Sequence, residues 1–154
     1  DALVTVAEEL RQMHNYLNIQ KLRYTNISLI EDINPPLLFA LIPKFTFQPI
    51  IENAIYHGLK YKESKGLLQV KGFMKDGNAV LQVIDNGVGM DEETLSHIYD
   101  KHKVNYHSNG VGVYNVQKRL KLYYGENYGI TYESEKGVGT TATITIPGIQ
   151  EESI

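Results

Sequence analysis

The chain contains no cysteine, which excludes disulfide bonds and thiolate chemistry and is compatible with a reducing compartment. It also lacks an apolar run long enough to cross a bilayer, and no signal peptide is recognisable. Its formal net charge of -3 is too small for nucleic acid to be expected as the main partner. The rest is an ordinary globular composition, with 42% hydrophobic and 21% charged residues among 154, which predicts one domain with a single core.

The sequence opens with Asp1 and Ala2 instead of an initiator methionine. We therefore interpret it as a fragment of a longer protein. Because no spanning segment is found in it, this interpretation is compatible with a membrane protein whose anchor lies elsewhere.

Four stretches are predicted to be helical. The first opens with a capping box from Thr5 to Glu8, and the first and last have apolar residues at helical spacing. The second has a proline in its first turn and the third has acidic residues there. These predicted helices are residues 5–24, 46–59, 91–99 and 112–124. The predicted strands are residues 27–33, 67–74, 79–84, 128–134 and 140–146, with a hairpin turn at 76–78. We expect a short strand or loop at 37–45 and a mobile loop at 101–109. Mostly antiparallel strands with helices on one face predict an α+β fold, a two-layer α/β sandwich.

The first of four short boxes with ligand-binding character runs from Pro49 to His57. Asn53 lies one helical turn before His57, so both can share one helix face. An amide carbonyl is a hard, neutral oxygen ligand that suits a Mg²⁺ ion otherwise held by water and phosphate oxygens. Taken alone, this box favours the alternative of a structural helix packed on the sheet, in which Asn53 caps a loop.

The second box, Asp85–Met90, places a carboxylate at the end of a predicted strand and follows it with two glycines. Asp85 is well placed to accept a hydrogen bond from an exocyclic amine such as N6 of adenine. Gly87 and Gly89 permit positive φ and remove Cβ atoms where a ligand comes close. The same Asp-Asn-Gly sequence is also common in tight turns, so this box alone is compatible with both interpretations.

The third box, Gly110–Val113, stands directly before a predicted helix, whose free amides and positive dipole end can bind an anion. The fourth box, Gly137–Thr140, lies in the last predicted hairpin, where Thr140 could bond a base or a bridging water beside Asp85. A flexible hinge and a plain β-turn are the respective alternatives. The sequence has no Gly-x-x-x-x-Gly-Lys-Ser/Thr loop, which excludes a P-loop enzyme, and the third box does not extend to a dinucleotide fingerprint.

In this order, the four boxes resemble the GHKL ATPase superfamily and, within it, the sensor histidine kinases of the LytS/YesM type. The resemblance covers nearly the whole chain. Beyond the boxes it rests on Tyr16-Leu-x-Ile-Gln20, Ile42-Pro43, Gln48–Gly58 and Gly110–Leu120. It implies a Bergerat-type fold, that of the histidine kinase-like ATPases.

The resemblance also implies roles for single residues. Asn53 would be the Mg²⁺ ligand, Asp85 the acceptor for the adenine amine, and residues 90–109 the ATP lid. The residues expected to bind ATP are Asn53, His57, Asp85, Gly87, Gly89, Met90, Gly110, Val111, Gly112, Val113 and Thr140. Glu52 points about 100° away from Asn53 around the helix and is the candidate catalytic base.

Three features depart from the family pattern. The acceptor-histidine segment is absent, so we do not expect autophosphorylation in cis. Tyr56 stands where many relatives have a lysine that could neutralise phosphate, and Pro49 occupies a place where several superfamily members keep an acidic or amide residue. Phosphoryl transfer depends mainly on positioning and charge neutralisation, so a missing base need not abolish it.

The sequence therefore predicts the ATP-binding catalytic domain of a two-component sensor histidine kinase at residues 26–148, after a linker or first helix at 1–25 and before a tail at 149–154. It would bind Mg·ATP and donate the γ-phosphate to a histidine on a dimerisation domain outside this sequence. The expected setting is the cytoplasmic part of a membrane-bound homodimer that signals to a response regulator. The alternatives are a serine-directed anti-sigma kinase, a GHKL ATPase, and a nucleotide-sensing module without phosphotransfer.

Overall fold

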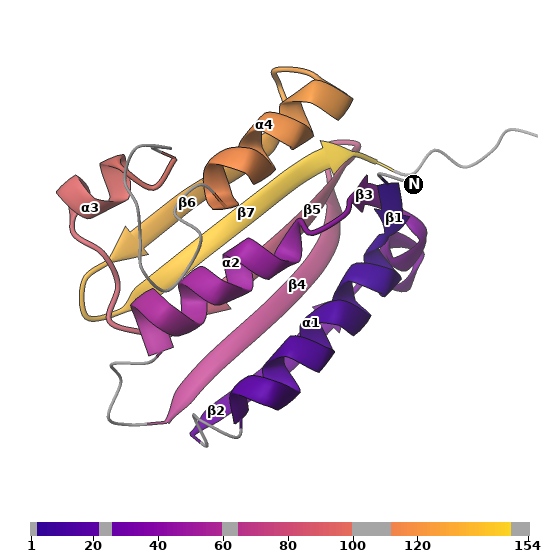
Figure 1. The fold of residues 1–154 in the computed structure, drawn as a ribbon. Helices are drawn as coiled ribbons and strands as arrows, with labels where there is room; N and C mark the ends of the chain where they lie inside the picture. Colours follow the sequence, from indigo (N-terminus) through magenta and orange to yellow (C-terminus); the bar gives the residue numbers. More distant parts are fainter. Residues whose placement is uncertain (1–2, 22–25, 60–64, 100–111, 149–154) are drawn as a thin grey trace, which may run out of the picture.

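The computed structural model describes residues 3–21, 26–59, 65–99 and 112–148. Its main element is a five-stranded sheet in the order β2-β4-β5-β7-β6 (Figure 1). Strands β2 and β4 pair in parallel, whereas the three other neighbouring pairs are antiparallel. The strands are β2 (Ile27–Ile33), β4 (Gly66–Lys75), β5 (Asn78–Asp85), β6 (Gly129–Glu135) and β7 (Gly139–Pro147).

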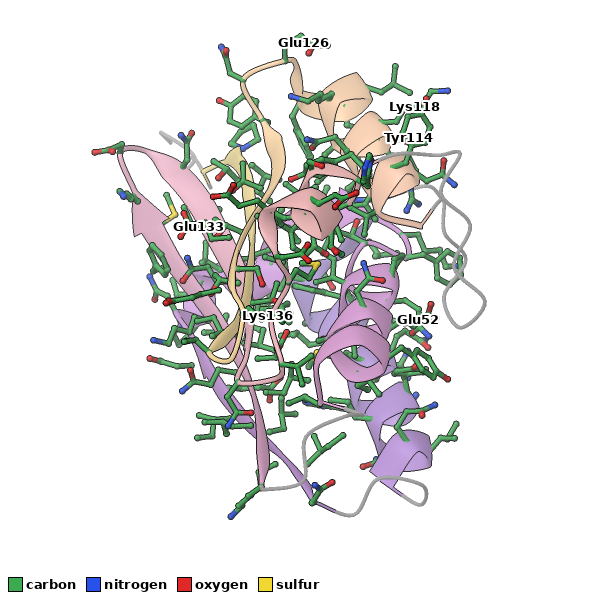
Figure 2. The ribbon with its side chains drawn as sticks, turned by 90° about the vertical axis from the view of Figure 1, so that its left-hand side faces the viewer. Glu52, Tyr114, Lys118, Glu126, Glu133 and Lys136 are labelled. Atoms are coloured by element: carbon green, nitrogen blue, oxygen red, sulfur yellow. The ribbon has the colours of Figure 1, made fainter. Side chains whose placement is uncertain are left out.

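Three helices cover one face of this sheet. They are α1 (Val6–Lys21), α2 (Phe47–Asn53) and α4 (Gly112–Tyr124). Figure 2, turned by 90°, shows the strands on one side and these helices on the other. The predicted two-layer α+β sandwich is therefore confirmed. Among the described residues, no helix combines the length and the apolar character that a bilayer crossing demands.

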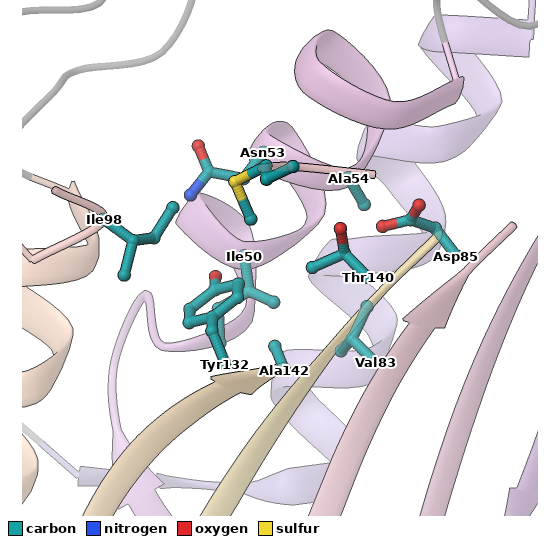
Figure 3. Close-up of a pocket in the computed structure, with 10 residues that line it drawn as sticks. Ile50, Asn53, Ala54, Val83, Asp85, Ile98, Tyr132, Thr140 and Ala142 are labelled. Atoms are coloured by element: carbon teal, nitrogen blue, oxygen red, sulfur yellow. The ribbon is translucent and has the colours of Figure 1, made fainter. Parts of the chain in front are cut away.

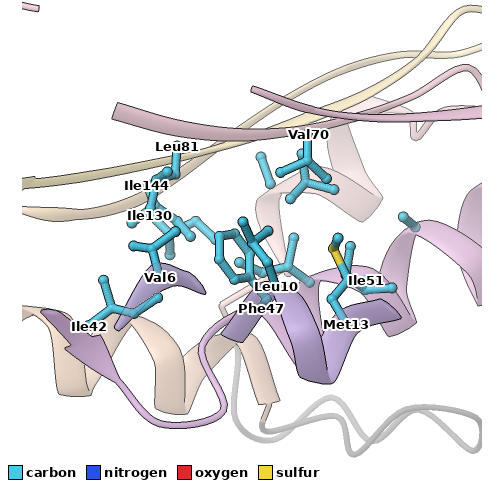
Figure 4. Packing of buried hydrophobic residues seen from close by; sticks show 14 of the residues in the cluster. Val6, Leu10, Met13, Ile42, Phe47, Ile51, Val70, Leu81, Ile130 and Ile144 are labelled. Atoms are coloured by element: carbon cyan, nitrogen blue, oxygen red, sulfur yellow. The ribbon is translucent and has the colours of Figure 1, made fainter. Parts of the chain in front are cut away.

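The core lies between the two layers, where buried apolar side chains of the helices meet those of the sheet (Figure 4). The helices contribute, among others, Leu10, Met13, Phe47 and Ile51, and the sheet contributes Val70, Leu81, Ile130 and Ile144. Complete burial of one such side chain stabilises the fold by about 1.5 to 3 kcal/mol. Since α1 supplies part of this core, it packs as a layer element together with α2 and α4.

Only one of the two hydrogen bonds of the predicted capping box is found at the start of α1. The Glu8 amide donates to the Thr5 hydroxyl at 3.1 Å, as predicted. The Glu8 carboxylate turns instead to Arg11, whose guanidinium donates to it at 2.5 and 3.2 Å. A small antiparallel pair of β1 (Leu3–Thr5) and β3 (Leu41–Pro43), together with the 3-10 helix η1 (Pro35–Phe39), completes this end of the molecule. The β1 strand and the η1 helix were not predicted.

Helix α2 is fixed at its start by a buried acid from α1. The Glu9 carboxylate, 3% exposed, accepts hydrogen bonds from the amides of Thr46 at 2.7 Å and Phe47 at 3.3 Å. A negative group at this place satisfies free amides and complements the helix dipole. The position of the helix that carries Asn53 therefore depends on α1.

The predicted helix at 46–59 is not α-helical throughout. Helix α2 ends at Asn53 and continues as one wide π-helical turn, η2 (Ala54–Gly58). Such turns are rare and occur frequently at functional sites. This turn brings the Gly58 backbone against Gly87, where an added Cβ would lie 2.4 Å from the Gly58 Cα.

The β4–β5 hairpin agrees with its prediction. Asp76 and Gly77 have φ of 52° and 79°, the positive values that a two-residue type I′ turn requires. The hairpin sets the register that places Asp85, the last residue of β5, opposite Leu68 of β4 and Thr140 of β7. Asp85 therefore lies at one end of the sheet, between two neighbouring strands.

Candidate functional site

A narrow pocket lies between α2 and the sheet (Figure 3). Asn53 of α2 and Asp85 of β5 both line it, so the structure brings together the two residues on which the sequence-based hypothesis depends. Its free space amounts to about 20 Å³, room for about one water molecule. The lining residues are Ile50, Asn53, Ala54, Val83, Asp85, Met90, Ile98, Tyr132, Thr140 and Ala142.

Asp85 is a buried carboxylate with an altered proton affinity. Its side chain is 6% exposed, and its Oδ1 accepts from the Gly87 amide at 2.9 Å. Burial raises the pKa of Asp85 from 3.8 to about 6, against the lowering effect of the Gly87 and Thr140 backbone amides. A carboxylate accepts about four hydrogen bonds, so these two amides leave acceptor capacity for a donor on a ligand.

Two glycines let the backbone close in around Asp85. An added Cβ on Gly87 would lie 2.4 Å from the Gly58 backbone, and one on Gly89 would lie 2.1 Å from the Glu135 carbonyl oxygen. Gly89 also has φ of 73°, which side chains rarely adopt. The second and fourth boxes thus pack together, and the Gly137 amide donates to the Val88 carbonyl at 2.7 Å.

Ser134 of β6 connects the pieces of this end of the pocket. Its hydroxyl accepts from the Met90 amide at 2.8 Å, donates to the Gly139 carbonyl at 3.1 Å and lies 2.7 Å from the Thr140 hydroxyl. Because the single Ser134 proton goes to Gly139, the Thr140 hydroxyl is the donor to Ser134. The Thr140 oxygen therefore has lone pairs, and no proton, to offer to a ligand.

At the Asn53 end, helix α4 begins beside α2. An added Cβ on Gly112 would lie 2.9 Å from the Pro49 Cβ, one helical turn before Asn53. Val113 follows as a buried residue, 4% exposed. The free amides in the first turn of α4 therefore lie close to the first turn of α2, where they can meet an anion. Gly110, Val111 and residues 100–109 of the expected lid lie outside the described residues.

Two predicted residues of the first box are not among the lining residues. The Glu52 carboxylate accepts from the Gln48 side chain at 3.1 Å, and Figure 2 shows Glu52 on the side of α2 away from the sheet. Its role as a base stays a prediction. His57 belongs to η2, and its side chain lies outside the described part of the structure, so its contact with phosphate also stays a prediction.

Sequence reasoning missed Tyr132, Ser134 and the apolar wall that Ile98 contributes. The available signal was the alternation in β6, where Ile130, Tyr132 and Ser134 share the inner face of the sheet. Polar atoms at two such positions indicate a site at the end of that strand.

The family model described as histidine kinase-, DNA gyrase B-, and HSP90-like ATPase matches residues 44–150. The chain belongs to this family. All residues that line the pocket, from Ile50 to Ala142, fall inside the matched range. The GHKL resemblance seen in the four boxes is thereby confirmed.

Named relatives lie among the sensor histidine kinases. The chain is 33% identical over 146 residues to the sensor histidine kinase YesM of Bacillus subtilis, across 94% of this chain and 24% of that protein. It is 35% identical over 130 residues to the sensor protein LytS of Oceanobacillus iheyensis, across 82% of this chain and 22% of that protein. It therefore spans about a quarter of the length of these relatives. The LytS/YesM resemblance is confirmed.

Solved structures with low sequence identity share the fold. The catalytic domain of histidine kinase ThkA matches with a TM-score of 0.70 and 16% identity, across 96% of this chain and 98% of that one. Full-length ShkA in complex with AMPPNP matches with a TM-score of 0.69 and 19% identity, across 95% of this chain and 31% of that one. These likenesses confirm the Bergerat-type sandwich of the histidine kinase-like ATPases.

Proposed function

We propose that this chain is the ATP-binding catalytic domain of a sensor histidine kinase, which holds Mg·ATP between α2, the end of the sheet and α4. The observation that carries the proposal is that Asn53 and Asp85 line one pocket. Membership in the ATPase family and relatives named as sensor histidine kinases support it.

The Asp85 end is suited to the adenine base. Asp85 and Thr140 both present acceptors, which match the two hydrogens of an exocyclic amine and would repel the oxo group of guanine. Apolar side chains such as Ile50, Val83 and Ala142 would contact the base faces. Because the pocket has room for about one water molecule, side chains at its rim must move when a purine enters.

The Asn53 end is suited to the triphosphate and its cation. Among the described residues, no group of three or more acidic or histidine side chains stands ready to hold a metal ion. One amide oxygen fits an ion that phosphate oxygens and water already coordinate, which is how Mg²⁺ is usually bound with nucleotides. Bound there, Mg²⁺ would neutralise phosphate charge, and the amides at the start of α4 would bind phosphate oxygens.

In the whole protein, the γ-phosphate would pass to a histidine of a dimerisation domain outside this sequence. A response regulator would then receive it, and the parent protein would be a homodimer, anchored in the membrane, with this domain in the cytoplasm. With Mg²⁺ bound, the site would supply positioning and charge neutralisation, the two main requirements of phosphoryl transfer. Glu52 is kept as the candidate base.

A second candidate is a nucleotide-sensing module that binds ATP without transferring phosphate. Tyr56 favours it, because a tyrosine lacks the positive charge with which a lysine would neutralise phosphate. A dimerisation segment that carries its acceptor histidine separates the two candidates. Labelling of that histidine from γ-labelled ATP supports the kinase, whereas tight ATP binding without labelling supports the sensor.

The first experiment is a calorimetric titration of the chain with ATP, with Mg²⁺ and with EDTA. We expect binding in both conditions and tighter binding with Mg²⁺. Asp85→Ala should lose affinity at least about 30-fold, because a hydrogen bond to a buried charge is removed. Asp32→Ala removes an exposed carboxylate of β2 and is the matched control. Absence of ATP binding by the unaltered chain, or full affinity in Asp85→Ala, would overturn the proposal.

A further inference from the structure

One polar group in the pocket has no hydrogen-bond partner among the described residues, and the proposed function gives it no role. The Tyr132 hydroxyl is buried and forms no hydrogen bond with the described residues. Burial raises the pKa of Tyr132 far above its ordinary value, so the phenol is neutral at physiological pH. Buried polar atoms are nearly always paired, and an exception in a ligand pocket calls for a functional reason.

Asn53 lines the same pocket and is the side chain with the largest influence on the pKa of Tyr132. The Asn53 amide lies close enough to lower the pKa of Tyr132, though not in a geometry that completes a hydrogen bond. In Figure 3 the phenol of Tyr132 and the amide of Asn53 lie on the same side of the pocket. The two groups are therefore neighbours in the pocket.

An asparagine side chain has two different ends, a carbonyl oxygen and an NH₂ group. If the oxygen is to face a cation, the NH₂ group needs an acceptor on the other side. We propose that Tyr132 is a positioning residue: its phenol oxygen accepts from the Asn53 NH₂ group and so directs the amide oxygen toward the cation. This inference rests on the proposed function and deepens it.

The phenol itself is held in place by a second tyrosine. The rings of Tyr99 and Tyr132 meet edge to face, with centroids 6.1 Å apart and planes at 70°. The Tyr99 hydroxyl donates to the Ile130 carbonyl at 2.9 Å, two residues before Tyr132 in β6. An edge-to-face pair contributes about 1 kcal/mol beyond its buried area, so the Tyr132 ring has a defined orientation from which to hold Asn53.

The test compares ATP affinity with Mg²⁺ and with EDTA in Tyr132→Phe. Partners that orient a metal ligand are typically worth about 10-fold or more in metal affinity. We expect Tyr132→Phe to reduce the Mg²⁺-dependent gain about 10-fold and to leave Mg²⁺-free affinity within about 2-fold. Tyr124→Phe is the matched control, because its hydroxyl donates to the Leu41 carbonyl, away from the pocket. Circular dichroism melts verify that both variants fold.

A double-mutant cycle supplies the second measurement. In an Asn53→Ala background, Tyr132→Phe should have no further effect on the Mg²⁺-dependent gain. Three outcomes overturn the inference: an unchanged gain in Tyr132→Phe, an equal loss with and without Mg²⁺, or additive effects in the cycle. An unaltered chain that binds ATP with no gain from Mg²⁺ also overturns it, whereas one that binds no ATP at all overturns the proposed function itself.

Discussion

At the Asp85 end of the pocket, hydrogen bonds connect the side chains to the neighbouring backbone. At the Asn53 end, the described residues form no comparable set of hydrogen bonds. Around Asp85, the Ser134 hydroxyl connects three neighbours and glycines pack directly on backbone. At the other end, the Asn53 amide and the Tyr132 hydroxyl stand near one another without a completed hydrogen bond. The difference teaches that the hydrogen bonds around Asp85, at the proposed base-binding end, are preformed, whereas the described residues of the proposed cation-binding end have no such framework.

The largest effect is expected where the preformed end is most crowded. In Gly87→Ala the new Cβ would lie 2.4 Å from Gly58 backbone atoms, which cannot turn aside as a side chain can. We expect the free energy of unfolding to fall by about 3 kcal/mol and ATP binding to be lost. Urea denaturation measures the first and calorimetry the second.

The matched control is Gly77→Ala in the β4–β5 turn. Gly77 has φ of 79°, but an added Cβ meets no atom within 4 Å. Its cost should therefore be the conformational one alone, about 1 kcal/mol. Equal losses in the two variants would show that the Asp85 end is not packed as tightly as described.

A second effect follows from the pKa of Asp85. A carboxyl whose pKa rises from 3.8 to about 6 on folding stabilises the fold fully below pH 3.8 and loses this contribution as the pH rises through 6. The ionised group therefore costs up to about 3 kcal/mol at neutral pH. Asp85→Asn should raise the free energy of unfolding of the nucleotide-free chain by about 1 to 3 kcal/mol at pH 7.5, while it weakens ATP binding.

Denaturation between pH 3.5 and 8 checks this prediction. The stability difference between Asp85→Asn and the unaltered chain should grow from pH 4 to pH 6 and then level off. A difference that does not change with pH would mean that Asp85 is ordinarily hydrated in the folded chain.

A third effect tests the less rigid end. Asn53→Ala should cost about 1.5 to 3 kcal/mol of ATP binding in the presence of Mg²⁺, and little with EDTA. Fluorescence titration with ATP in the two buffers measures the loss of affinity with Mg²⁺ and with EDTA. A loss of equal size in both buffers would place Asn53 against the nucleotide itself and remove the contrast between the two ends.

The smallest effect is expected for Ser134→Ala, because the surrounding backbone keeps its other contacts. The variant loses the hydrogen bonds to Met90, Gly139 and Thr140. We expect a loss of about 1 kcal/mol in stability and a modest fall in affinity for adenosine, which probes the base end alone. Thermal unfolding with and without adenosine measures both. Unchanged stability would show that the Ser134 hydrogen bonds do not hold this end together.

Elements with strong local signals were predicted well. Helix α4 runs from Gly112 to Tyr124 as its apolar spacing predicts, and Gly125 follows it with φ of 103°. The Asp76-Gly77 turn could likewise be predicted from its own two residues, since both tolerate positive φ. The four boxes and the resemblance that they support were sufficient to place Asn53 and Asp85 in one pocket.

The features that were missed depend on contacts between residues that are separated in the sequence. The π-helical turn η2 ends at Gly58, whose neighbour Gly87 lies in another box. The role of Ser134 depends on the register of β6 with β7, where it lies opposite Thr140. The hydrogen bond between Gln48 and the Glu52 carboxylate was not predicted either, and the role of Glu52 as a base stays a prediction. Local patterns do not contain these relations.

The narrowness of the pocket has a kinetic consequence. With about 20 Å³ free beside Met90 and Ile98, the proposed function requires that side chains part before a purine docks. If that opening precedes arrival, the observed association rate in a stopped-flow mixing experiment will reach a plateau as nucleotide concentration increases. Small planar fragments that need less opening would then associate faster than adenosine does.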